Sequence, residues 1–166
     1  PGQWDAQRLN PNQRRLGAEV KPGGVVMFPT THDLTPEFLP EALVTLKNLL
    51  RHHQVLVVTK PHHSVVAALC RELAEHKKDL LFRFTIGAQN PALCGFWEPG
   101  APPPRERIQA LQHAQRQGFA TSVSIEPMLD SVDATVALVA HLTPWVTETL
   151  WIGKMQRVPV KLNAHV

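Results

Sequence analysis

The sequence contains very little cysteine, no tyrosine and no long apolar run. Only two of its 166 residues are cysteine, Cys70 and Cys94, and they lie far apart in the chain. So few cysteines exclude a secreted scaffold held together by disulfides. A membrane-spanning helix needs about 20 consecutive apolar residues, and a signal peptide needs a shorter apolar core after a basic start. Neither is visible, so we expect a cytoplasmic protein with no membrane partner.

The balance of charge is also small. The chain has 17 Lys and Arg against 14 Asp and Glu, a formal net charge of +3 with neutral histidines. This excess does not predict nucleic-acid binding without a basic patch, and doublets such as Lys77 with Lys78 are typical of a solvated surface. A hydrophobic content of 43% over this length instead predicts one globular domain with a sizeable core.

Short apolar runs rich in β-branched residues recur along the chain and predict strands. The predicted strands are Val25–Phe28, Val55–Thr59, Leu80–Ile86, Thr121–Ile125 and Thr149–Ile152. Segments with helical periodicity lie between them, and this alternation predicts an α/β fold with a parallel sheet covered by helices. A closed eight-stranded barrel typically needs about 250 residues. The chain is therefore either an open doubly wound sheet or an incomplete TIM-like (βα) barrel of about five strands.

Helix signals divide the rest of the chain. Helices are predicted over residues 36–53, 64–77, 104–117 and 130–142. Thr35 is the expected N-cap of the first, Asp130 that of the last, and Gly118 ends the third. Residues 87–107 are predicted to be a long Pro/Gly loop, of the kind that is often functional. Residues 1–22 are predicted to be an irregular arm, and residues 23–166 the α/β domain.

Each predicted strand is followed by polar or charged residues. In parallel α/β proteins ligands bind at the carboxyl ends of the strands. A single polar residue there is ordinarily solvated, but polar residues at five neighbouring strand ends indicate a binding site. These candidate site residues are Thr31, His32, Asp33, Lys60, Thr85, Glu126 and Lys154. Arg83, inside an apolar strand, needs a partner, and we expect Glu126 or Asp33 to provide it.

Motifs for metal binding or nucleophilic catalysis are not found in this sequence. The histidines occur as the doublets His52–His53 and His62–His63, and adjacent side chains on a helix point in different directions. Metal-ligand spacing is not met, and no GxSxG motif or Cys–His pair stands out. We therefore predict no metal site in this chain.

The strand-end segments resemble the radical S-adenosylmethionine (radical SAM) superfamily, in its spore photoproduct lyase-like branch. The similar segments are VVMFPTTHDLTPE, VLVVTKPH, LLFRFTIGA, FWEPGAPPPRERIQAL, GFATSVSIEPMLD and LWIGKM, in the same order and with similar spacing. The resemblance covers roughly residues 22–156. It implies a partial (βα)6 barrel that binds S-adenosylmethionine at the carboxyl rim beside a [4Fe–4S] cluster. Such enzymes cleave the cofactor reductively to a 5′-deoxyadenosyl radical.

The resemblance also implies roles for the candidate residues. The turn Thr31–Asp33 would meet the amino group of the methionine moiety, for which a carboxylate and hydroxyl groups are suitable acceptors. Lys60 would approach the methionine carboxylate, and Thr85 would offer a hydroxyl. Glu126 would line the cofactor site at the fifth strand of the family barrel, and Lys154 ends the sixth.

The sequence departs from the family at the cluster. The family holds three irons with three cysteines, usually CxxxCxxC, after the first barrel strand, and this chain has no such run. Because Cys70 falls in a predicted helix and Cys94 in the predicted loop, neither matches. We therefore expect no cluster ligands here and no radical chemistry from this chain alone.

Three hypotheses follow. The chain, which begins with Pro1 and not Met, is a fragment of a radical SAM enzyme whose cluster is supplied by a missing N-terminal segment or a partner. Alternatively, it is a repurposed non-catalytic module that binds a small molecule or nucleotide, or that oligomerises. The third and weakest hypothesis is an enzyme that uses His32 and Asp33 as an acid–base pair. An incomplete barrel exposes sheet edges, so we also expect a homo-oligomer, namely a dimer.

Overall fold

The computed structural model describes residues 24–155. Within them, five strands form one all-parallel sheet in the order β1-β2-β3-β4-β5. The strands are β1 (Val25–Phe28), β2 (Gln54–Thr59), β3 (Leu80–Thr85), β4 (Ala120–Met128) and β5 (Leu150–Lys154). The predicted α/β class and its parallel sheet are thus confirmed. The predicted arm, residues 1–22, lies outside the described residues.

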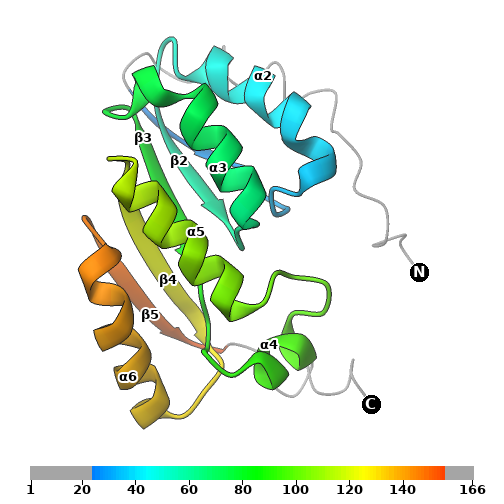
Figure 1. Ribbon diagram of the computed structural model, residues 1–166, viewed down its shortest axis with the longest axis vertical. Coiled ribbons are helices and arrows are strands. Elements are labelled where there is room, and N and C mark those ends of the chain that lie inside the picture. The colour runs from blue at the N-terminus through cyan, green and yellow to red at the C-terminus, as the bar shows by residue number, and fades with distance from the viewer. Residues whose placement is uncertain (1–23, 156–166) are drawn as a thin grey trace.

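The strand order decides which face of the sheet the helices cover. Consecutive parallel strands that lie side by side need crossover connections, and these are almost always right-handed. Because the order never reverses, every crossover helix lies on the same side, and Figure 1 shows α2, α3, α5 and α6 there. A doubly wound sheet has a reversal of strand order, and the sheet within residues 24–155 has none, so the alternative of an open doubly wound sheet is wrong for this part of the chain. Sequential order is the order of (βα) barrels, and the incomplete TIM-like barrel stays a prediction.

The helices follow the predicted periodicity with shifted ends. They are η1 (Pro36–Phe38), α2 (Leu39–Leu49), α3 (His63–Glu72), η2 (Ala74–His76), α4 (Pro91–Trp97), α5 (Pro104–Arg116), α6 (Val132–Leu142) and η3 (Thr143–Trp145). Gly118 follows α5 with a φ of 79°, a left-handed conformation that favours glycine, so its predicted role as a stop is confirmed.

Two predictions about helices are wrong. Residues 87–107 are not one long loop, because α4 lies within them and contains Cys94. Asn90 caps this helix by accepting a hydrogen bond from the Ala92 N–H at 2.9 Å. At the start of α6 the cap is Ser131, whose side chain accepts from the Ala134 N–H at 3.3 Å. Asp130 instead accepts a hydrogen bond from the Ser131 N–H.

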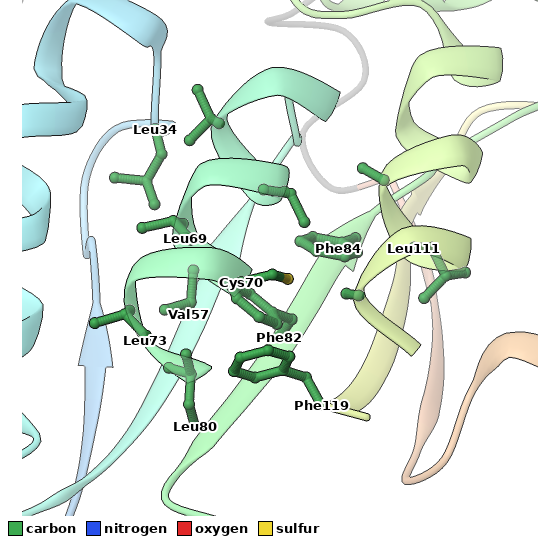
Figure 2. Packing of buried hydrophobic residues seen from close by; sticks show 14 of the residues in the cluster. Leu34, Val57, Leu69, Cys70, Leu73, Leu80, Phe82, Phe84, Leu111 and Phe119 are labelled. Carbon is green, nitrogen blue, oxygen red and sulfur yellow. The ribbon is translucent and has the colours of Figure 1, made fainter. Parts of the chain in front are cut away.

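The core fills the space between these helices and one face of the sheet. Phe82 and Phe84 of β3 are fully buried and stack with ring centroids 5.5 Å apart, and Phe119 meets Phe82 edge-on. Figure 2 shows Leu69 and Cys70 of α3 packed against this aromatic group. Alternate residues of a strand point to opposite faces, so the residues between these phenylalanines face the other way.

The other face of the sheet is covered by no helix within residues 24–155. We call it the open face and define it by one set of strand residues that alternate with the core residues: Val25, Met27, Leu56, Val58, Leu81, Arg83 and Trp151. Three of these are large exposed apolar side chains, with exposed fractions of 65% for Val25, 47% for Met27 and 51% for Trp151. The sheet therefore has one face that is buried against the helices and one face with solvent-exposed side chains.

Candidate functional site

A cavity of about 420 Å³ lies at the carboxyl edge of the sheet. This size lies within the range of small-molecule sites, and the place is the one where parallel α/β proteins bind ligands. Figure 1 shows α4 at this end of the molecule, toward which the strands point. The turns after β1, β2 and β4, the segment that follows α4, and the residue after β5 contribute the wall. Its residues are Asp33, Thr35, Lys60, His62, Trp97–Pro102, Pro127, Leu129 and Met155.

An ion pair between Asp33 and Lys60 forms the charged part of this wall. Lys60 Nζ lies 3.2 Å from Asp33 Oδ2, and the Lys60 backbone N–H donates to Asp33 Oδ1 at 2.7 Å. Thr59 connects the two turns, because its hydroxyl donates to Asp33 Oδ1 and accepts from the Leu34 N–H. The Asp33 and Lys60 side chains remain 34% and 28% exposed. The pair is thus fixed in place yet open to a ligand.

The remaining candidate residues, Thr31, His32, Thr85, Glu126 and Lys154, do not line the cavity. The Thr31 hydroxyl lies 3.4 Å from His32 Nδ1, whereas Asp33 bonds to Lys60 and Thr59, so His32 and Asp33 have different partners. Thr85 ends β3, and its carbonyl accepts a hydrogen bond from Arg107. The structure therefore brings together two of the candidates, Asp33 and Lys60, in one wall.

Glu126 and Lys154 lie at the ends of β4 and β5, and both are exposed. Glu126 lies over Gly153, where a Cβ would come within 2.7 Å of its carboxyl carbon. Gly153 therefore leaves the room that this carboxylate occupies. Neither Glu126 nor Lys154 lines the cavity.

Sequence reasoning missed a buried ion pair that includes Glu98 of the cavity wall. Arg107 is 1% exposed, and its guanidinium lies 2.7 Å from the carboxylate of Glu98. Arg107 also donates to the carbonyls of Pro102 at 2.6 Å and of Thr85 at 3.2 Å. It therefore joins α5 to the end of β3 and to the cavity-lining segment. The charges in FWEPGAPPPRER were a signal, but the sequence does not reveal which of its charged residues is buried.

Two further contacts fix the rim. A Cβ on Gly87 would lie 2.8 Å from the Pro127 carbonyl oxygen and 3.0 Å from the Leu129 side chain, so the ends of β3 and β4 approach closely only because this residue is glycine. The Gly87 carbonyl accepts from the Leu129 N–H. On the other side, Glu106 of α5 accepts from the His63 N–H at 3.0 Å, at the start of α3.

The predicted partner of Arg83 is wrong. Among residues 24–155 neither Glu126 nor Asp33 forms an ion pair or a hydrogen bond with it; Asp33 pairs with Lys60 instead. Its Nε donates to the Ser122 hydroxyl at 3.0 Å, and its Nη2 donates to the Thr149 hydroxyl at 3.4 Å. The guanidinium also lies over the Trp151 ring, 5.2 Å from the centroid. Its neighbours are therefore neutral.

The two cysteines do not suit an iron–sulfur cluster. Cys70 is buried in the core, and burial raises the pKa of its thiol to about 12. Burial also raises the pKa of the Cys94 thiol, which donates to the Ala88 carbonyl. Clusters are held by thiolates. Within residues 24–155 no three His, Cys, Asp or Glu side chains are grouped to hold a metal ion. The residues present thus do not fit a [4Fe–4S] cluster.

The fold and cavity define an all-parallel α/β protein with a small-molecule-sized site at the carboxyl edge of its sheet. The chain is similar to a curated viral protein, the uncharacterized protein ORF301 of Acidianus two-tailed virus, with 26% identity over 109 residues. That alignment covers 64% of this chain and 35% of the viral protein, so the chain spans about a third of its relative's length. No protein-family model matches the chain, and no solved structure does.

None of the helices within residues 24–155 combines the length and the apolar character that a bilayer crossing requires.

Proposed function

We propose that the cavity at the carboxyl edge binds the methionine end of S-adenosylmethionine, as the resemblance to radical SAM proteins implies. The observation that carries this proposal is the Asp33–Lys60 ion pair on the cavity wall. An α-amino acid group carries one ammonium and one carboxylate close together. The ammonium is complementary to Asp33 and the carboxylate to Lys60, so the bound zwitterion would replace one ion pair with two.

The energetic cost of opening the pair is small. Both side chains are about one-third exposed, and ion pairs of this kind contribute only about 0–1 kcal/mol. Asp33 also keeps its hydrogen bond from the Lys60 backbone N–H, which holds the carboxylate in place when the Lys60 side chain moves. The pair is thus a preformed site for a zwitterion and not a rigid structural bridge.

The rest of the cavity suits the adenosyl and sulfonium part. Trp97, Leu129 and Met155 form an apolar and aromatic part of the cavity wall. Such a wall is usual in sites for ligands of this size. Thr31, His32, Thr85, Glu126 and Lys154, which the resemblance also implicates, would act from the outer rim. Their proposed role is to contact the cofactor when it extends beyond the cavity.

We further propose that these 166 residues bind the cofactor without cleaving it. Reductive cleavage in the family depends on a cluster, and the donor set of this chain does not fit one. The thiolates would come from a further segment of a longer protein or from a partner chain. Anaerobic reconstitution with iron and sulfide should therefore give no stoichiometric absorbance near the visible iron–sulfur bands. Such absorbance would contradict this part of the proposal.

A second candidate is a non-catalytic module that binds a nucleotide or another small molecule, or that oligomerises through its open face. The exposed Val25, Met27 and Trp151 favour association. Light scattering gives the oligomeric state, and calorimetry gives the affinity for S-adenosylmethionine. A dimer with no affinity for S-adenosylmethionine would support this alternative against the first proposal. An acid–base enzyme built on His32 and Asp33 is not favoured, because their hydrogen-bond partners differ.

Isothermal titration calorimetry with S-adenosylmethionine tests the first proposal. We expect saturable binding to the wild-type chain and a loss of at least about tenfold in affinity for Asp33→Asn and for Lys60→Met, the usual effect of removing a charged hydrogen bond. Lys47→Met is the matched control, since Lys47 forms an exposed ion pair with Glu72 at 3.5 Å between α2 and α3. Equal affinity in all four proteins would overturn the proposal.

A further inference from the structure

Arg83 carries a positive charge on the open face, and no carboxylate within residues 24–155 pairs with it. Among residues 24–155 it forms no ion pair with a carboxylate, whereas the chain's buried arginine, Arg107, lies 2.7 Å from Glu98. A guanidinium stays charged at any ordinary pH, so the charge of Arg83 must be accommodated as it is. The two arginines thus differ in charge compensation: Arg107 has a carboxylate partner, and Arg83 has none among the described residues.

The neighbours of Arg83 orient the guanidinium without neutralising it. The hydroxyls of Ser122 and Thr149 accept one hydrogen bond each, and the indole of Trp151 stacks at 5.2 Å. Trp151 is itself held, because its Nε1–H donates to the Thr149 hydroxyl at 3.0 Å. No hydrogen bond within the described residues uses Nη1. A fixed, partly buried guanidinium with unused donors is the arrangement that binds carboxylates and phosphates in two-point contacts.

The surroundings on the open face add a second requirement. Val58 is the register partner of Arg83 on β2, and Leu56 and Leu81 form the next row, all three partly accessible. A ligand whose anionic group reaches Arg83 would therefore lay its remaining atoms on apolar side chains or on the Trp151 ring. A simple inorganic anion would contact Arg83 and would leave the apolar side chains and the Trp151 ring unused.

We infer that Arg83, positioned by Ser122, Thr149 and Trp151, binds the carboxylate or phosphate group of a small molecule with an apolar or aromatic body. This site lies on the open face, and none of its residues lines the cavity that holds Asp33 and Lys60. The inference goes beyond the proposed function and does not depend on it.

Nuclear magnetic resonance titration of the full chain tests this inference. The reporter is the indole N–H signal of Trp151, assigned by its loss in Trp151→Phe, and the Trp145 signal serves as the internal reference. The probes are benzoate and phenyl phosphate, with neutral benzamide as the matched control. We expect saturable shifts of the Trp151 signal with both anions below about 10 mM, the weak affinity of small fragments, and none with benzamide. The stronger of the two anions identifies the source as a carboxylate or a phosphate.

Variants separate the charge of Arg83 from general effects. Arg83→Met should weaken anion binding at least about tenfold, and Arg83→Lys, which keeps the charge and loses the fork, should lie between it and wild type. Arg116→Met is the matched control, because Arg116 also lies over a tryptophan, 5.0 Å from the Trp145 centroid, on the helix side. It should bind like the wild type. If Arg83→Met does not fold, Arg83→Lys carries the test.

Three outcomes would overturn the inference: equal shifts with benzamide, unchanged anion affinity in Arg83→Lys and Arg83→Met, or no saturable shift with either anion. A concentration-dependent dimer that Arg83→Met dissociates would also overturn it, since the face would then belong to a second copy. Titration of Arg83→Met with S-adenosylmethionine tests whether the open-face site and the cavity bind independently. Retained cofactor affinity with lost anion affinity supports this inference without reference to the cavity.

Discussion

The two faces of one sheet have opposite roles in this molecule. On β3, Phe82 and Phe84 point to the helices and are fully buried, while Leu81 and Arg83, which alternate with them, point to the open face and remain partly accessible. The same strand therefore provides apolar side chains for the core and a charged side chain on the open face. The helix-covered face therefore sets the stability of the fold, whereas no helix within residues 24–155 covers the open face, where we propose a ligand site.

The largest expected difference between the faces is in the free energy of unfolding. Phe82→Ala should destabilise the protein by about 3–5 kcal/mol, because it leaves a cavity where the ring contacts Phe84 and Phe119. Leu81→Ala, one residue earlier and on the open face, should cost no more than about 1 kcal/mol. Urea denaturation followed by circular dichroism measures both. Equal losses would show that the open face is packed as tightly as the core.

The next effect compares the two arginines. Arg107→Met removes one partner of a buried ion pair and two hydrogen bonds to carbonyls, and it should destabilise the fold by about 3 kcal/mol. Arg83→Met on the open face should cost less than about 1 kcal/mol, because its partners are hydroxyls near solvent. The double variant Glu98→Gln with Arg107→Met should recover part of the loss. Thermal melting of these three variants against the wild type measures the losses. If the double variant recovers nothing, an uncompensated Glu98 charge is not the cause of the destabilisation.

The smallest effect is a pH dependence on the helix-covered side. Burial lowers the pKa of His113 below its ordinary 6.5, and the positive charges of His63 and Arg116 lower it further. The unfolded chain thus binds this proton more readily than the folded chain. The free energy of unfolding should therefore be highest above about pH 6.5, the pKa of histidine in the unfolded chain. It should fall as the pH drops from there toward the lower pKa of His113 in the folded chain. His113→Gln should flatten this slope in pH-dependent melting, and the exposed His141→Gln is the control; an unchanged slope would contradict the assignment.

Much of the fold could be predicted from the sequence because its signals are local. Continuous β-branched runs such as Val55–Thr59 occur where strands form, and leucines at helical spacing place Leu46 and Leu69 in the core. The helix α4 was missed because seven residues are too few to show a period, although Asn90 and Pro91 form a regular helix start. In α6 the valines Val132 and Val136 recur at helical spacing, yet both are exposed, and the helix buries Thr135, Leu138 and Leu142 instead.

The candidate site could be predicted in part. Asp33 and Lys60 follow adjacent strands, so parallel topology alone places them at one edge. Their bond to each other, the burial of Arg107 and the neutral partners of Arg83 depend on which side chains meet across elements. Those pairings are set by three-dimensional packing and have no local signature in the sequence.

The central claim is that the Asp33–Lys60 pair recognises a zwitterion. The most direct test compares S-adenosylmethionine with decarboxylated S-adenosylmethionine, which keeps the ammonium and lacks the carboxylate, by calorimetry on the wild type and on Lys60→Met. The wild type should prefer the intact cofactor by about tenfold or more, the value of one charged hydrogen bond. Lys60→Met should lose that preference. Equal affinities of the wild type for the two ligands, or a preference that Lys60→Met retains, would contradict the claim.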